Sequence, residues 1–341
     1  MEKYVLNETP IRTARNFGIN HVEVDVEIPE YKTFENVNIY ADLSKVNVIH
    51  NIVKEKYTSR IGLESLKNEE IKIIVPENTY LEEPIKLEFD IDEDNEYLSE
   101  NIDILVKENS NVKFEFIYTG TGFHNGKIKY VIEKQSKVKN TIANLIEDGE
   151  SFIEVENSLE EESKLNTTWI EIGGKDKISN YYTKLIGNFS KNELNVVYLG
   201  KENDIIDINY NMEAYGKRTE EVINVQGAIT DNVKKNFKGT IDFKEGATKS
   251  VGKENENCML LSPNAKSKSL PMLLCHEEDV VGEHGVSSGK IDENKLFYIM
   301  TKGISYNDAK KLIIKANFYE ILNNVKNEEI KKIIDKKIDE I

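Results

Sequence analysis

The 341-residue chain is poor in cysteine, with only Cys258 and Cys275. Two cysteines cannot provide the four thiolates of a structural zinc site or of an all-thiolate iron–sulfur site within one chain. In a reducing compartment such a pair is also more typical of free thiols than of a disulfide. A metal or metal cluster bound by this protein would therefore need other ligands or a second chain.

The chain also lacks long apolar runs and an excess of basic charge. No run approaches the roughly 20 apolar residues that a membrane span needs, and the first residues, MEKYVLNETP, lack the basic and apolar regions of a signal peptide. We therefore expect a cytoplasmic protein without a membrane partner. The 61 Asp and Glu residues outnumber the 45 Lys and Arg residues, which gives a formal net charge of -16. Because binding to nucleic acid requires basic groups at the phosphates, we expect a protein or metal partner and no nucleic acid.

Short strand-like segments recur between about residues 35 and 290. In the segment 111–120, NVKFEFIYTG, apolar and charged side chains alternate, which is typical of a strand with one buried face. Gly, Asn and Asp separate such segments, and no long helical pattern interrupts them. The pattern predicts a large all-β body, either a sandwich or barrel or a solenoid such as a parallel β-helix. The length favours the solenoid, but without a strict sequence repeat the periodicity leaves both open.

The C-terminal part of the chain changes to a helical pattern. Ser305 followed by Asp308 resembles a capping box, which predicts a helix start. We expect this helix to carry Ala309, Leu312, Ile313, Ala316 and Tyr319 on one face. A second helix is expected to start near Asn327, with an isoleucine stripe at positions 330, 333, 334, 338 and 341. The predicted division is an N-terminal segment (1–34), a β core (35–300) and a helical region (301–341).

Two motif-like stretches do not carry the chemistry that they suggest. The stretch 120–127, GTGFHNGK, has three residues between Gly122 and Gly126 where a P-loop needs four, so we expect a turn between strands. The stretch 276–280, HEEDV, lacks the second histidine of a zinc protease motif.

One cluster of reactive residues remains near the end of the predicted β body. It contains Cys258, Cys275, His276, Glu283 and His284. In a regular strand the neighbours Glu283 and His284 point to opposite faces, so only one of them can face a given metal unless a bulge intervenes. The competing interpretation is structural, because a cysteine is often a small buried hydrophobe.

At these residues the sequence resembles a known family. The stretch from about 255 to 322 is similar to the C-terminal core of the SufB/SufD iron–sulfur cluster assembly scaffolds. The matching features, in chain order, are a polar segment with a cysteine, LLSPNAKSKSLPMLL, EHG, GKIDENKLFYIMTKGIS and a helix starting DAKKLII. The stretch 224–250 resembles the family more loosely, and residues 1–200 offer only a compatible β-rich character.

The resemblance implies a right-handed parallel β-helix with helical ends. Family members are not enzymes; they pair with one another and bind an ABC-type ATPase, SufC, through the C-terminal helical region. The nascent iron–sulfur cluster is expected at the interface of the pair. From the segment 306–319 we expect Tyr306, Leu312, Ile313, Ala316 and Tyr319 to contact the ATPase.

The resemblance also suggests metal ligands. Cys258 falls close to the cysteine of the SufB branch that receives sulfur and ligates the nascent cluster. His284 matches the histidine that the SufD branch places at the pairing interface, and Glu283 matches an acid preceding the corresponding SufB histidine. Gly285 agrees with SufD, whereas Gly282 replaces a SufD cysteine. This mixture of branch features suggests a homodimer, with a heterodimer as the alternative.

The residue types fit a transient iron–sulfur cluster. A mixed set of thiolate, imidazole and carboxylate ligands holds iron less firmly than four thiolates, which suits release. Cys258 could accept sulfur from a cysteine desulfurase or another donor if its thiol is accessible and its pKa is not raised by burial. Two alternatives remain. One is a SufD-like partner that binds the ATPase without ligating the cluster. The other is a β-helix enzyme acting on acidic polysaccharide, which the negative charge disfavours.

Overall fold

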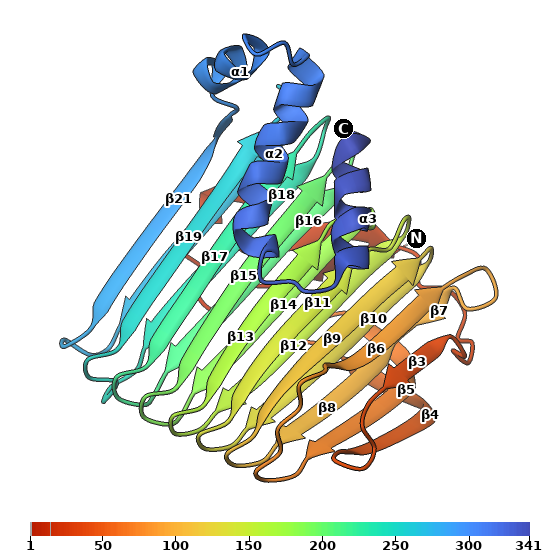
Figure 1. Ribbon diagram of the computed structural model, residues 1–341, viewed down its shortest axis with the longest axis vertical. Helices are drawn as coiled ribbons and strands as arrows, with labels where there is room; N and C mark the ends of the chain where they lie inside the picture. The colour runs from red at the N-terminus through yellow and green to blue at the C-terminus, as the bar shows by residue number, and fades with distance from the viewer. Residues whose placement is uncertain (1, 14) are drawn as a thin grey trace.

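The computed structural model describes residues 2–13 and 15–341; Met1 and Ala14 of the expected N-terminal segment lie outside the described residues, as does the side chain of Arg15. The chain forms a parallel β-solenoid of about 8 turns, with helices at its C-terminal end (Figure 1). The expectation of a mainly β protein with a parallel solenoid and a helical appendage is therefore confirmed.

Two facing sheets form the solenoid, because each turn contributes one strand to each of them (Figure 1). We name each sheet after its last strand. The β20 sheet contains β4 (Asn47–Thr58), β5 (Glu64–Val75), β7 (Tyr97–Leu98), β8 (Glu100–Val106), β10 (Phe123–Ile132), β12 (Glu150–Leu159), β14 (Asp176–Leu185), β16 (Ile205–Ala214), β18 (Lys234–Phe243) and β20 (Lys266–Cys275). The β21 sheet contains β3 (Val37–Tyr40), β6 (Ile85–Ile91), β9 (Asn111–Gly120), β11 (Lys137–Asn144), β13 (Lys164–Glu171), β15 (Lys191–Gly200), β17 (Glu220–Ile229), β19 (Val251–Leu260) and β21 (Val281–Lys290).

Alternation along the strands builds the interior between the sheets. In β9, Val112, Phe114, Phe116 and Tyr118 are buried in the main core, as the sequence predicts, whereas Lys113 lies on the outer face. Residues in register on successive parallel strands point to the same side, so these apolar positions form continuous columns through the solenoid. A turn adds between 26 residues, as from Glu150 to Asp176, and 32 residues, as from Lys234 to Lys266.

A repeated corner sets the start of six consecutive strands in the β21 sheet. Two residues before each of these strands, the backbone is in the left-handed region, at Asn109, Gln135, Glu162, Phe189, Arg218 and Lys249. The next residue is a buried Ser or Thr, at positions 110, 136, 163, 190, 219 and 250. Their hydroxyls bond to backbone or to one another, as in the 2.8 Å bond from Thr219 Oγ1 to Ser250 Oγ. The corners therefore stack as a polar ladder along one side of the solenoid.

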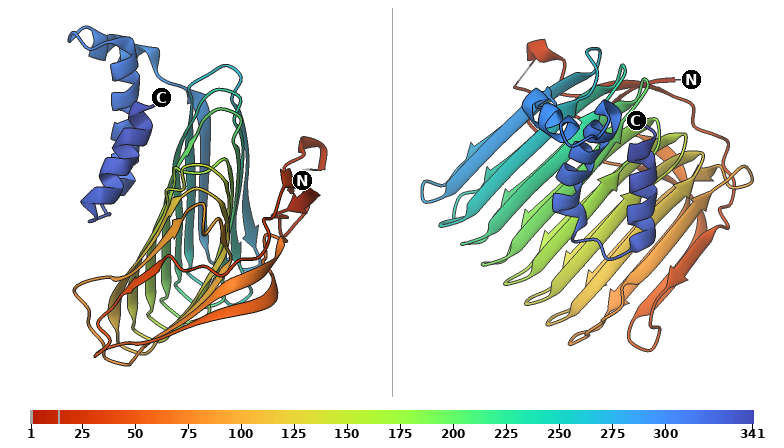
Figure 2. Two further views of the ribbon diagram at one scale, coloured as in Figure 1. Left: turned by 90° about the vertical axis from the view of Figure 1, so that its right-hand side faces the viewer. Right: turned by 45° about the horizontal axis from the view of Figure 1, so that its top comes forward.

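The chain ends cover opposite outer faces of the solenoid (Figure 2). Helix α1 (Glu293–Met300) follows β21 directly, and α2 (Tyr306–Leu322) and α3 (Glu328–Asp339) pack on the outer face of the β21 sheet. The hairpin of β1 (Glu2–Leu6) and β2 (Val22–Val26), with the short 3-10 helix η1 (Arg15–Phe17), lies against the β20 sheet. The helical part thus begins eight residues before position 301, while the domain division itself stays a prediction.

The C-terminal helices start where the sequence predicts. Ser305 caps α2 by accepting from the backbone N–H of Asp308, and Asn327 caps α3. Ile330, Ile334 and Ile338 of α3 are buried, which confirms the isoleucine stripe. The predicted face of α2 is divided between packing and exposure: Ala309 is buried, but Leu312 and Ala316 are exposed. The sheet is covered mainly by Ile314, Phe318, Ile321 and Leu322.

Asn7 anchors the N-terminal segment to three strands that lie far away in sequence. Its side chain donates to the carbonyl of Ser179 (3.1 Å) and to Oδ1 of Asp207 (2.7 Å). The buried ammonium of Lys238 donates to the Asn7 carbonyl at 2.6 Å and also contacts Asp207. Asn7 has a φ of 55°, which Asn tolerates better than most residues. The segment therefore closes over β14, β16 and β18.

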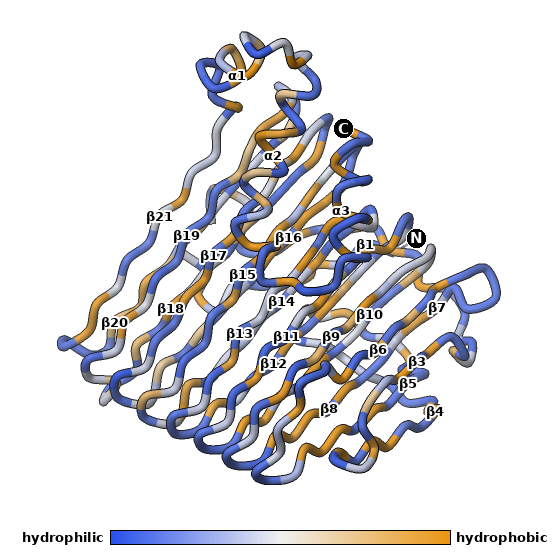
Figure 3. The backbone as a smooth tube through the Cα atoms, viewed as in Figure 1, coloured by the Kyte–Doolittle hydropathy of each residue, from blue (hydrophilic) through white to orange (hydrophobic). Residues whose placement is uncertain are grey.

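Figure 3 shows hydrophobic and hydrophilic residues alternating along most strands, with no uniformly hydrophobic element. Among the described residues, no helix has the length and apolar character needed to cross a membrane.

Candidate functional site

The last turn of the solenoid is open. All ten residues of β21 are exposed, and β20 is only partly covered. Within the described chain, no further strand pairs with the outer edge of either one. The two strands meet at Ser267 and Ser288, whose hydroxyls are 2.9 Å apart. We call β20 and β21 together the open end; it presents two unpaired strand edges side by side, which is the arrangement that accepts a further strand.

The strand register places His284 on the interior side of the open end. His284 lies opposite Glu254 of β19, and Ser288 lies opposite Cys258. Partners in a parallel ladder share a face, so His284, Glu254 and Cys258 all point between the two sheets. Glu283 points to the outer face, where its carboxylate lies 3.3 Å from the Lys253 ammonium. The structure therefore separates Glu283 from His284, as strand alternation predicts.

Cys258 is buried beneath the open end. It has no solvent exposure and belongs to the main core. Burial raises the pKa of the Cys258 thiol, and the nearby Lys235 ammonium opposes this only in part. Along the ladder, Cys258 is four residues from the level of His284, which corresponds to roughly 13 Å. Within one chain a single ion cannot touch both side chains, and the described residues contain no group of three His, Cys, Asp or Glu side chains positioned for a metal.

A polar network surrounds Cys258. Glu256 accepts from Tyr198 Oη (3.0 Å) and from Ser269 Oγ (2.6 Å), and it forms a fully buried ion pair with Lys235. Of the inward side chains of β19, Glu254, Glu256 and Cys258 are polar or sulfur-bearing and Leu260 is apolar, whereas β9 fills the same layer with apolar groups. The inward side of β19 is thus more polar than that of β9.

Two further carboxyl groups in these turns have no hydrogen-bond partner. Both oxygens of Glu221 in β17 and of Glu254 in β19 are buried and unpaired. Burial, with a smaller contribution from Glu256, raises the pKa of Glu254 to about 8. Burial likewise raises the pKa of Glu221 to about 8. Neither residue stands out from the sequence alone. For Glu254 the available signal was the segment 253–257, KENEN, which is polar on both faces of a predicted strand.

Cys275 and His276 lie at the far end of β20, away from Cys258. Cys275 is exposed and lies opposite Phe243 in the ladder. His276 is exposed, with its Nε2 3.6 Å from Oδ1 of Asp242. The structure therefore disperses the five-residue cluster seen in the sequence over three strands, β19, β20 and β21, and both ends of the last turn.

The residues expected to bind a partner lie on α2. Tyr306, Leu312 and Ala316 are exposed. Ile313 and Tyr319 are half-buried against the helix–sheet core, and Tyr319 donates to Asp335 of α3 at 3.0 Å. Three of the five side chains are thus exposed to solvent on α2, and the other two pack against the core beneath the helix.

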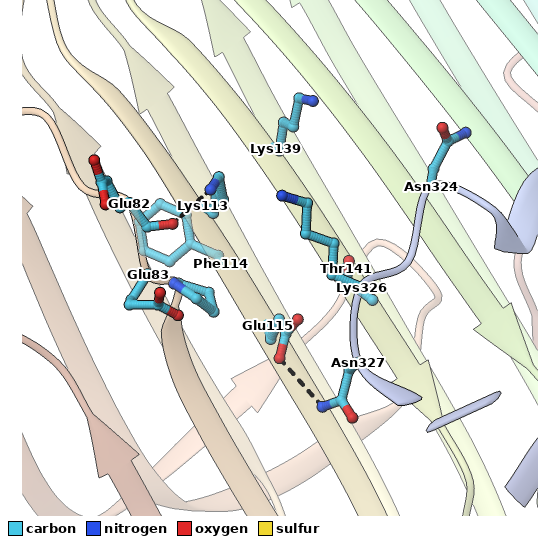
Figure 4. A pocket seen from close by; sticks show the side chains of 11 residues that line it. Glu82, Glu83, Lys113, Phe114, Glu115, Lys139, Thr141, Asn324, Lys326 and Asn327 are labelled. Carbon is cyan, nitrogen blue, oxygen red and sulfur yellow. Dashed lines mark hydrogen bonds between the residues drawn. The ribbon is translucent and has the colours of Figure 1, made fainter. Parts of the chain in front are cut away.

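A cavity of about 350 Å³ lies between β9, β11 and the α2–α3 connection (Figure 4). Its walls mix Lys and Glu side chains, and Asn327 bridges to Glu115 with a 3.4 Å hydrogen bond. None of the metal-ligand or partner-binding candidates from the sequence lines it.

Comparison with known proteins agrees with the sequence resemblance. Residues 89–317 match the family model described as SUF system FeS cluster assembly, SufBD core domain. The chain is similar to the iron–sulfur cluster assembly protein SufD of Bacillus subtilis (strain 168), with 22% identity over 322 residues, which are 88% of this chain and 74% of that protein. It is 31% identical over 176 residues to an iron–sulfur cluster assembly SufBD family protein of Pyrococcus horikoshii, covering 50% of this chain and 38% of that protein. Identity to SufD of Escherichia coli (strain K12) is 26% over 166 residues, covering 47% of this chain and 38% of that protein.

Proposed function

We infer that this chain, which belongs to the SufBD core family of the SUF iron–sulfur cluster assembly system, is a scaffold subunit that builds a nascent cluster at its open end. A second SufB/SufD-type subunit joins there, and a homodimer is the favoured pair. The chain catalyses no reaction itself, and the cluster is its cargo. The work takes place in the cytoplasm, without nucleic acid or membrane.

The observation that carries this proposal is the exposed strand β21. It offers an unpaired edge, two bare faces and three glycines, and it carries His284. A strand from a second subunit can continue the ladder there and place its own His284 nearby. Cys258 lies one strand further inside than β21. Its thiol becomes available to receive sulfur or to bind the cluster when the last turn of the solenoid moves away.

An ABC-type ATPase of the SufC kind is the proposed source of that opening. The exposed side chains of α2, Tyr306, Leu312 and Ala316, form the docking surface. Helix α1 follows β21 after two residues, so force on the helices reaches the open end directly. The ATPase would shift the equilibrium only if it binds the opened form more tightly. A cysteine desulfurase or related donor supplies the sulfur.

Anaerobic reconstitution tests the scaffold function. The complex purified with its partners is incubated with ferrous iron and sulfide, and cluster formation is followed by visible absorption. His284→Ala and Cys258→Ser should each lose most of the absorption, whereas Glu93→Ala, at an exposed position in the connection between β6 and β7, should keep it. If both His284→Ala and Cys258→Ser gave the full cluster yield, neither residue would be a cluster ligand.

A SufD-like partner role is the second candidate. The buried Cys258 thiol, with its raised pKa, favours it, because the reactive form of cysteine is the exposed thiolate. In that case Cys258→Ser leaves the cluster yield unchanged while Leu312→Glu still abolishes co-purification of the ATPase. The mass of the intact complex distinguishes a homodimer from a heterodimer.

A further inference from the structure

We propose that Glu254 and His284 together bind a divalent transition-metal ion at the open end, with ferrous iron as the occupant in the cell. This inference rests on the proposed function and deepens it, because it assigns the carboxylate that receives iron before the cluster forms. Glu283, the neighbour of His284 in sequence, is excluded from this role since it points to the opposite face.

The register brings the two side chains together. Glu254 and His284 are direct partners on adjacent parallel strands, so their side chains leave the same face about 5 Å apart. Glu254 itself has no solvent exposure. One turn earlier in the same column stands Ile223, which can offer no hydrogen bond. Glu254 therefore has Ile223 in register on one neighbouring strand, β17, and the imidazole of His284 in register on the other, β21.

The facing sheet leaves room for the carboxyl without giving it a partner. A Cβ atom at Gly239 of β18 would lie 2.0 Å from Oε1 of Glu254, so the carboxyl occupies space that only a glycine leaves. In β20 the residue in register with Gly239 is Pro271, which has no backbone N–H to donate. Both carboxyl oxygens remain free for a ligand.

A purely structural role does not account for Glu254. Leaving a buried polar group unpaired costs about 1–3 kcal/mol, and Ile223 shows that an apolar side chain fits the same column. Glu256, only two residues away, has three partners. Glu221, one strand further inside, is also unpaired, but it lies in register with Gly252 of β19, so among these two carboxyl groups only Glu254 has a histidine in register.

The pair has the chemistry of a delivery site. Imidazole and carboxylate together suit ferrous iron and the neighbouring first-row divalent ions. Two protein ligands leave further positions for water, sulfide or a group from the second subunit. Such a site binds iron where the second subunit pairs with β21, and releases it to the cluster as the cluster forms.

Cobalt(II) titration of the purified full-length chain tests this site. Binding is followed by visible absorption and by the shifted imidazole proton resonances that a cobalt-bound histidine gives. Moderate salt screens weak binding by surface carboxylates. Glu254→Gln and His284→Asn should each weaken the tightest site at least tenfold, and His284→Asn should abolish the shifted resonances.

Two matched controls define the result. Glu221→Gln removes an equally buried, equally unpaired carboxyl one strand further inside, and Glu283→Gln removes the carboxyl next to His284 in sequence; both should bind cobalt like wild type. Glu254→Met replaces the carboxyl by an apolar group and covers the case in which the glutamine variant unfolds. Unchanged cobalt affinity in a folded Glu254 variant, or an equal loss in Glu221→Gln, overturns the inference.

The outcome is separable from that of the proposed function. If cobalt binds through Glu254 and His284 but the wild-type complex assembles no cluster, the proposed function fails and the metal site stands. If the cluster forms normally in Glu254→Gln and cobalt binding is unchanged, the metal site fails and the scaffold function stands.

Discussion

At the scale of single residues, the last turns of the solenoid bury carboxyl groups between the two sheets, as the Glu100–His124 pair does in the earlier turns. Interior positions of most turns hold apolar side chains, while β17 and β19 bury Glu221, Glu254 and Glu256 there. Only Glu256 has compensating partners. These residues lower stability locally, which is the cost commonly found at functional positions.

Glu221 should make stability depend on pH. Its pKa is about 8 in the folded state against an ordinary value of 4.5. Between these values the unfolded chain has lost the proton that the folded chain retains, so stability falls as pH rises through that window, by at most about 1.4 kcal/mol per pH unit. Glu221→Gln should therefore gain stability relative to wild type from pH 5 to pH 8, measured by urea unfolding, with Glu93→Gln as an exposed control. Parallel pH curves for wild type and Glu221→Gln would contradict the assignment.

The two cysteines should differ in reactivity. Cys275 is exposed, whereas Cys258 is buried with a raised pKa. At neutral pH we expect iodoacetamide to modify Cys275 at least roughly tenfold faster than Cys258, because alkylation needs an accessible thiolate. Peptide mass spectrometry over time gives both rates, and Cys275→Ser isolates the slow one. Equal rates would mean that the last turn opens readily in the free chain.

At the scale of elements, the C-terminal helices have separate structural and exposed faces. Ile334 of α3 is fully buried against the β21 sheet, whereas Leu312 of α2 is 48% exposed. Ile334→Ala should destabilise helix docking by about 2–5 kcal/mol, because it leaves a cavity in the core. Leu312→Ala should leave stability unchanged. Hydrogen exchange over α2 and α3 measures the difference, and similar protection in both variants would argue against this division of faces.

The sequence predicts those elements whose pattern is local. The alternation in 111–120 identifies a strand, and Ser305 and Asn327 identify two helix starts, because strand faces and caps depend on neighbouring residues. The segment 293–300 was assigned to the β core, but it forms α1, capped by Asp292. The sequence did not decide which face of α2 is buried, because both sides of that helix carry apolar residues and only the sheet beneath selects one.

The site was less predictable, because it depends on register between strands. Strand alternation separates Glu283 from His284, but no local pattern pairs His284 with Glu254, thirty residues earlier. The repeat that would have revealed the register is the Ser or Thr before each strand, at 110, 136, 163, 190, 219 and 250. Its spacing varies from turn to turn, so it does not appear as a strict repeat.

At the scale of the whole molecule, the open end should control assembly. A Cβ atom at Gly289 of β21 meets nothing within 4 Å, so a side chain fits there in the single chain. Gly289→Lys should keep the fold and block addition of a second subunit, because lysine on an edge strand disfavours pairing. Native mass spectrometry should show single copies where wild type shows pairs, and Glu93→Lys should behave like wild type. Persistent pairs in Gly289→Lys would place the interface elsewhere.

The bonds of Asn7 also impose an order on events during synthesis. Its partners Ser179, Asp207 and Lys238 leave the ribosome long after Asn7 does. At the usual elongation rates of about 5–20 residues per second, the first residues wait roughly ten to fifty seconds for a surface on which to settle. The segment around Asn7 is thus among the last parts of the chain to pack, and during synthesis a chaperone could bind it before its partner strands exist.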